Sequence, residues 1–364
     1  MRRPLHIAFA VLASLCVAAP LGRAQDAAAD DAAMRHYRAY RAALAANDWI
    51  VAEREAASAF AAAQIEAPES ARNAALAANL AAARLELGRA EEAIVPAEIA
   101  YARAQAAGQD TLPARLLLAR AELGAGRVAG VARASAALAE AEARSDLAGD
   151  AYVAASALGA FHFARADYEE AQTSFAAAQA FARGDEGAFA RAQAQVKEGA
   201  ALVMLGEHAR ARDALDEALA ALAPFAQSNG PNGEMTAAQV ARAEAQAWRA
   251  LSFAARGRSA PQTLTAEAEQ AANLCDVRIA MVPPPVYPRE ALSETRVGAV
   301  VMRFTIDSDG RITSRQAAAY APTRDFAEAV ERVAGQWRVE RNISSAPSCQ
   351  MARTANMTIS FVID

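Results

Sequence analysis

The sequence predicts an α-solenoid of helix pairs followed by a small domain with the order strand, strand, helix, strand. Apolar residues recur with the 3.6-residue period of a helix from residue 31 to residue 274. Turn residues within this region recur at intervals of about 40 residues, a period typical of repeat proteins. From residue 277 to residue 364 the pattern changes to alternating strands around an Asp-Gly turn.

Ahead of these two domains, residues 1–24 have the pattern of a secretory signal peptide. Two arginines precede an apolar run at 5–19, and the small residues Gly22 and Ala24 occupy the −3 and −1 positions before Gln25. The apolar run is shorter than the roughly 20 residues that span a bilayer. We expect cleavage and export to the periplasm of a Gram-negative cell. The alternative is an uncleaved inner-membrane anchor, and only then would the chain contact a membrane.

The composition of the chain excludes some classes of partner. It has 364 residues, a net charge of −5 and a pI of about 5.6, so it lacks the basic surplus that nucleic-acid binding requires. Hydrophobic residues make up 54% of the chain, but many of them are Ala. Because Ala favours helix in any context, the helix predictions rest on periodicity rather than propensity.

Five helix-turn-helix units follow one another in residues 31–274. Their turns fall near Asn47, Gly88, Gly126, Ala166 and Gly206, which are 41, 38, 40 and 40 residues apart. In such an array each helix pair contacts only its neighbours, and the stack forms a concave surface suited to binding.

Three stretches resemble tetratricopeptide repeats: LGRAEEAI, ARADYEEAQTSFAAAQAFA and MLGEHARARDALDEALA. In that family small residues lie where two helices touch, a position assigned here to Ala93, Ala171 and Ala214. The period of about 40 exceeds the usual 34. The alternative is a generic α-solenoid without a peptide groove.

No motif for catalysis stands out. The four histidines are scattered without a second ligand at helical spacing, and no P-loop, GxSxG or HExxH sequence occurs. We therefore expect a non-enzymatic protein with no metal and no cofactor. A hydrolase with an unrecognised site is the alternative from another class.

Two cysteines remain once the signal peptide is removed. Cys275 and Cys349 are an even pair in an exported chain, one before the first segment of the last domain and one before its final strand. This arrangement predicts a disulfide.

The elements of the last domain follow from the pattern of residues 298–364. Residues 298–307 alternate as a half-buried strand, Asp309 and Gly310 form a turn, and a weaker strand follows at 311–320. A helix comes next, with one apolar stripe made of Phe326, Val330, Val333, Ala334 and Trp337. Residues 355–364 alternate again and close the domain.

Several of these residues together resemble the C-terminal domain of the TonB family. They are Tyr287, Pro288, Gly298, Asp309, Gly310, Phe326 and Trp337. The resemblance implies a periplasmic module that grips a short peptide of an outer-membrane receptor. Full TonB proteins also pass proton-motive energy from the inner membrane to transporters. This chain lacks the Pro-rich spacer of that family, and the linker at 338–354 is long.

The last strand is the expected partner-binding edge, because a free edge accepts an extended peptide through main-chain hydrogen bonds. Met357, Ile359 and Phe361 should face the helix. Thr358, Ser360 and Val362 should face away from it. No charged residue between 355 and 363 guards this edge.

The sequence thus predicts an exported periplasmic interaction protein with two partners, and no nucleic acid among them. An outer-membrane receptor or another envelope protein would dock on the C-terminal domain. A second, unknown protein or peptide would bind the helical array. The alternative is a true energy transducer for TonB-dependent transport, held by an uncleaved anchor.

Overall fold

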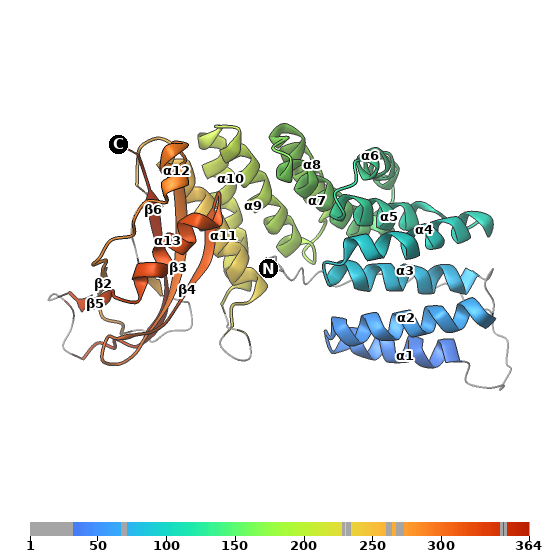
Figure 1. Ribbon diagram of the computed structural model, residues 1–364, viewed down its shortest axis with the longest axis horizontal. Coiled ribbons are helices and arrows are strands. Elements are labelled where there is room, and N and C mark those ends of the chain that lie inside the picture. Colours follow the sequence, from blue (N-terminus) through green and yellow to red (C-terminus); the bar gives the residue numbers. More distant parts are fainter. Residues whose placement is uncertain are drawn as a thin grey trace. The chain divides into compact units, whose positions relative to one another are not determined.

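The computed structural model describes residues 32–66, 71–227, 230, 234–259, 264–266, 273–342, 345 and 348–363 (Figure 1). The predicted signal peptide lies outside these residues. The contacts within the chain define two compact units, Met1–Gly184 and Asp185–Asp364. The predicted boundary between 274 and 277 differs from this division, which groups the last helices with the sheet.

The first unit consists of helices in its described part. They are α1 (Ala32–Ala45), α2 (Trp49–Glu66), α3 (Ala71–Glu86), α4 (Ala90–Ala106), α5 (Leu112–Gly124), α6 (Ala129–Ala141), α7 (Ala148–Ala164) and α8 (Tyr168–Phe181), with a 3-10 turn at Ser145–Leu147. Successive helices pack against each other, as in a solenoid.

The second unit begins with three more helices and ends in strands. The helices are α9 (Ala188–Met204), α10 (His208–Leu222) and α11 (Ala237–Ala254), with a 3-10 turn at Ala223–Phe225. The rest comprises β1 (Leu264–Ala266), β2 (Val277–Ala280), α12 (Arg289–Ser293), β3 (Gly298–Ile306), β4 (Ile312–Ala321), α13 (Arg324–Ala334), β5 (Arg338–Arg341) and β6 (Arg353–Phe361). The predicted fold class is confirmed.

All five predicted turn residues have a left-handed backbone. Their φ angles are 54° at Asn47, 72° at Gly88, 75° at Gly126, 64° at Ala166 and 78° at Gly206. At each turn the following N–H donates to the carbonyl five residues before it, with N···O distances of 2.8–3.0 Å. This is the Schellman motif, which ends a helix and redirects the chain into the next one.

Small residues allow the two helices of a pair to come close. A Cβ added to Gly159 would lie 2.7 Å from the Phe175 ring, and one added to Gly199 would lie 2.6 Å from Leu215. Five residues after four of the turns stands a fully buried alanine: Ala52, Ala93, Ala171 and Ala211. The small position assigned to Ala214 is therefore wrong, because Ala211 occupies it and Ala214 is only half-buried.

The strands of the second unit form a four-stranded antiparallel sheet in the order β1-β6-β3-β4. A separate ribbon pairs β2 with β5. The sequence predicted β3, β4, α13 and β6. It did not predict β1 or β2, and it treated the residues of β5 as a linker.

A different helix covers each face of this sheet. The even-numbered residues Val300, Met302 and Phe304 pack in one core with α13. Ala299 and Val301 point to the other face and are also fully buried, and α11 contacts β3, β4 and β6 (Figure 1). The last solenoid helix is therefore part of the sheet domain's core.

Candidate peptide-binding edge

The sheet has two lateral edges, and the two are protected differently. β4 forms one edge, and its pairing with β3 shifts register twice, between Val301 and Met302 and between Thr305 and Ile306. Such bulges twist an edge and discourage pairing with another strand. At the other side of the sheet lie β1 and the rim of β6 that points away from β3, and this rim is the remaining candidate.

The hairpin connecting β3 to β4 fixes which main-chain groups of β3 point toward β4. The N–H of Asp307 donates to the carbonyl of Arg311 at 3.0 Å, and the carbonyl of Thr305 accepts from the Thr313 hydroxyl at 3.2 Å. Main-chain groups alternate along a strand. The odd-numbered residues of β3 therefore bond β4, and the even-numbered residues bond β6.

This alternation carries over into β6. Met302 lies opposite Met357, so these two residues form a hydrogen-bonded pair. It follows that the odd-numbered residues of β6 bond β3. The main-chain groups of Asn356 and Thr358 point to the opposite rim, where an added strand would pair.

Part of that rim is taken by β1, a strand of the same chain. It runs antiparallel to β6 with the pairs Leu264↔Met357, Thr265↔Asn356 and Ala266↔Ala355. The described part of β1 ends opposite Met357. β6 continues past it from Thr358 to Phe361.

The side chains of the predicted edge residues alternate as expected. Met357, Ile359 and Phe361 are buried in the core that contains Phe326 and Trp337. Thr358 and Ser360 are half-buried on the other face, and Val362 follows the end of β6. Their binding role stays a prediction.

A trio of aromatic rings holds the end of β6 in place. The ring centroids of Phe361 and Phe326 are 5.1 Å apart, and that of Tyr287 is 5.5 Å from Phe361 and 5.9 Å from Phe326. The two contacts of Tyr287 are edge-to-face, an arrangement that stabilises beyond the buried area. A Cβ on Gly298 would lie 2.4 Å from the Phe326 ring, so the glycine makes room for it.

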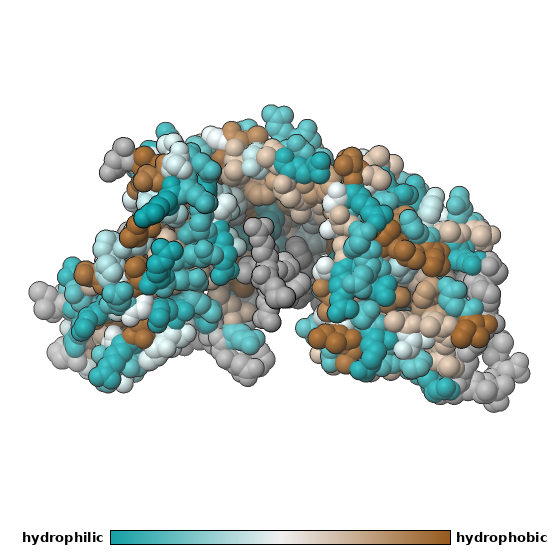
Figure 2. Space-filling model, in the orientation of Figure 1, coloured by the Kyte–Doolittle hydropathy of each residue, from teal (hydrophilic) through white to brown (hydrophobic). Residues whose placement is uncertain are grey.

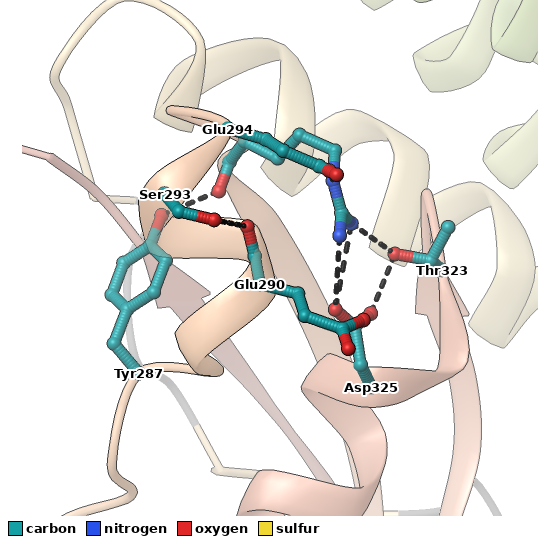
Figure 3. A network of polar contacts seen from close by, with 7 residues as sticks. Tyr287, Glu290, Ser293, Glu294, Thr323 and Asp325 are labelled. Carbon is teal, nitrogen blue, oxygen red and sulfur yellow. Dashed lines mark hydrogen bonds and ion pairs between the residues drawn. The ribbon is translucent and has the colours of Figure 1, made fainter.

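Polar contacts fasten the segment that carries Tyr287 to the domain. The Tyr287 hydroxyl donates to the carbonyl of Arg296 at 2.7 Å, and burial raises the pKa of this tyrosine. The Arg296 guanidinium donates to the Thr323 hydroxyl at 2.8 Å and lies 3.4 Å from the Asp325 carboxylate (Figure 3). Its hydrogen bond with Glu294 is the main reason that the pKa of Arg296 is raised.

Three other predicted motif residues have structural positions. Trp337 is buried and its Nε1 donates to the carbonyl of Pro283 at 2.8 Å. Pro288 precedes α12 as its N-cap. Gly310 takes a left-handed φ of 79° in the hairpin turn.

The hairpin turn also depends on a residue that the sequence reading did not single out. The Asp307 carboxylate accepts the N–H groups of Asp309 and Arg311 at 3.0 and 2.8 Å. An Asp that precedes an Asp-Gly pair by two residues is the signal that could have revealed it.

A disulfide joins Cys275 to Cys349, the pairing expected from the sequence. Main-chain bonds accompany it. The N–H of Cys275 donates to the carbonyl of Gln350 at 3.0 Å, and the N–H of Gln350 donates to the carbonyl of Asn273 at 2.8 Å. Residues 273–275 are thereby fixed beside the segment that leads into β6.

Among the described residues there is neither a metal-binding cluster nor a helix that could span a membrane. They contain no group of three or more His, Cys, Asp or Glu placed to hold a metal. None of the helices they form has the length and apolarity needed to cross a bilayer. On the face drawn in Figure 2, apolar residues lie scattered among polar ones.

The fold defines a small antiparallel-sheet domain with α13 on one face of the sheet and α11 on the other. Residues 283–363 match the family described as Gram-negative bacterial TonB protein C-terminal. Protein TonB of Pseudomonas aeruginosa is 36% identical over 92 residues. These residues are 25% of this chain and 26% of that protein, so the chain spans about a quarter of the curated relative that it matches.

One solved structure is similar to this chain in sequence over the same domain. The solution NMR structure of the Pseudomonas aeruginosa TonB CTD is 36% identical, covers 24% of this chain and 88% of its own, and has a TM-score of 0.21. The C-terminal part of this chain is a TonB-type C-terminal domain, preceded by many helices.

Proposed function

We propose that this protein is an exported interaction protein of the Gram-negative envelope. Its TonB-type domain accepts an extended peptide of an outer-membrane receptor, or of another envelope partner, as a strand added to β6. The observation that carries this proposal is the direction of the Thr358 main chain toward the rim beyond β1. Strand addition uses such main-chain groups for affinity.

The helical array is proposed to bind a second protein through a tetratricopeptide-type surface. Support comes from the packing of one repeat, in which Leu158 and Gly159 precede the turn and Ala171 and Phe175 follow it. These residues match the family's L-G and A-x3-F spacings. The periplasm is the proposed location, since a TonB-type domain acts there in its family.

A change at Thr358 tests the edge. Thr358→Pro removes the main-chain donor that points to the rim and leaves the bonds to β3 in place. We expect the variant to fold and to bind synthetic peptides, copied from the N-terminal segments of outer-membrane receptors, at least roughly tenfold more weakly. Titration calorimetry measures this difference.

Thr358→Val is the matched control, because it keeps both the N–H and the β-branched side chain. It should bind as the wild type does. Equal affinities of a folded Thr358→Pro variant and the wild type would contradict strand addition at this edge. In that case the TonB-type domain would serve the helical array only as a structural cap.

Energy transduction is the second candidate, favoured by the match to Protein TonB. It requires the chain to stay anchored in the inner membrane, because the energy comes from there. Sequencing the N-terminus of the mature protein separates the two candidates. A start at Gln25 supports the exported interaction protein, and an intact Met1 in the inner membrane supports the transducer.

A further inference from the structure

The rim of β6 that the proposed function assigns to a partner is shared with a segment of the same chain. β1 pairs with Ala355–Met357, and its central residue Thr265 lies opposite Asn356. Because the main chain of Asn356 points to the rim, Thr265 and Asn356 form the hydrogen-bonded pair. β1 therefore uses the kind of main-chain contact that an incoming strand would use.

The described part of β1 pairs with a short stretch of β6. This described part has three residues, whereas β3 and β6 have nine each. Leu264 is only partly buried against the core that β3, β6 and α13 build.

The disulfide keeps β1 near the rim. Only nine positions separate Ala266 from Cys275, and six separate Cys349 from Ala355. Arg353, the first residue of β6, donates from Nη2 to the carbonyl of Cys275 at 2.7 Å. A short tether of this kind gives an intramolecular segment a high effective concentration at its site.

We propose that β1 is an intramolecular competitor for the partner strand. The inference rests on the proposed function, because it concerns the same rim. A partner segment that pairs only from Thr358 onward can bind beside β1. A longer extended segment that also pairs with Asn356 has to displace β1, so the domain selects between short and long partner strands.

Occupation of the rim can be tested without any partner. In the mature full chain, Thr265→Pro removes the N–H that faces Asn356. We expect hydrogen–deuterium exchange of a β6 peptide containing Asn356 to become roughly tenfold faster. Thr265→Val keeps the N–H, so its β6 peptide should exchange at the wild-type rate. The exchange rate in Thr265→Gly should lie between those of the wild type and Thr265→Pro.

Protection of the β3–β4 hairpin in the same experiment reports that the domain is folded. Unchanged exchange at Asn356 in the folded Thr265→Pro variant would overturn the inference, regardless of how tightly the receptor peptides bind. Faster exchange without any receptor peptide binding would leave the occupation of the rim by β1 standing and would contradict the proposed function alone.

Competition is tested with two lengths of the receptor peptide that binds the wild type. The longer peptide should bind Thr265→Pro about tenfold more tightly than the wild type, if the rim is open about a tenth of the time. A peptide truncated to the part that pairs from Thr358 onward should bind both proteins equally. Equal affinities for the longer peptide would overturn the competition.

Discussion

Gly298 has no side chain, and this allows the residues around the end of the proposed edge to pack closely. It is the first residue of β3 and lies opposite Phe361, the last residue of β6. The space that a Cβ would fill is taken by the Phe326 ring, which also contacts Phe361 and Tyr287. The glycine thus allows the aromatic trio to form and to fix the end of the proposed edge.

Gly298→Ala is expected to destabilise the second unit by about 1–3 kcal/mol, because the added methyl group overpacks a fully buried ring. Urea unfolding followed by circular dichroism measures the change. The double variant Gly298→Ala with Phe326→Leu should lose less than the sum of the two single changes. Additive losses would show that the methyl group and the ring do not meet.

Ala166 presents the opposite case, a side chain where glycine would fit better. It has a φ of 64° in a turn whose counterparts at Gly88, Gly126 and Gly206 are glycines. A left-handed backbone costs a residue with a Cβ about 1–2 kcal/mol. The chain tolerates this cost because the Schellman bonds and the packed helices on both sides hold the turn.

Ala166→Gly should therefore stabilise the first unit by about 0.5–1 kcal/mol. Gly126→Ala, in the same unit and with nothing within 4 Å of the added Cβ, should destabilise it by a similar amount through backbone strain alone. Thermal unfolding of both variants gives the signs. A loss of stability in Ala166→Gly would mean that the methyl group contributes more by packing than it costs by strain.

At the scale of elements, the strands and helices with long periodic patterns were predictable. β3 alternates from Met302 to Ile306, β6 alternates from Ala355 to Phe361, and α13 carries an apolar stripe from Phe326 to Ala334. The turns at Gly88 and Gly126 were predictable because glycine readily adopts the left-handed backbone that ends a helix.

The elements that were missed are short and depend on distant partners. The described part of β1 has three residues, and β2 and β5 have four each, which is too few to display a period. Each becomes a strand only because another segment pairs with it. The partial cover over β6 was consequently invisible in the sequence, where the uncharged edge was interpreted as available to a partner strand.

At the scale of the whole molecule, the sheet domain and the solenoid share a helix. α11 begins with a capping box in which Thr236 and Gln239 satisfy each other's main-chain N–H. Buried alanines on α11 face more than one direction, because it packs on α9 and α10 as well as on the sheet. A boundary drawn at 274–277 would separate the sheet from α11, the helix that packs on one of its two faces.

Two fragments of the chain, one with α11 and one without it, should differ in their stability. Residues 271–364 carry the TonB-type domain, and the three prolines at 283–285 favour an extended lead-in that lets it fold alone. Residues 185–364 form the compact unit and add α9, α10, α11 and β1. In the shorter fragment Ala299 and Val301 would lose their cover, and exposing one valine costs roughly 1.5–3 kcal/mol. We expect both fragments to unfold cooperatively in urea, with the shorter one less stable by at least that amount. Equal stabilities would mean that α11 contributes nothing to the sheet domain, and the solenoid would then be only a neighbour of the TonB-type domain rather than part of its core.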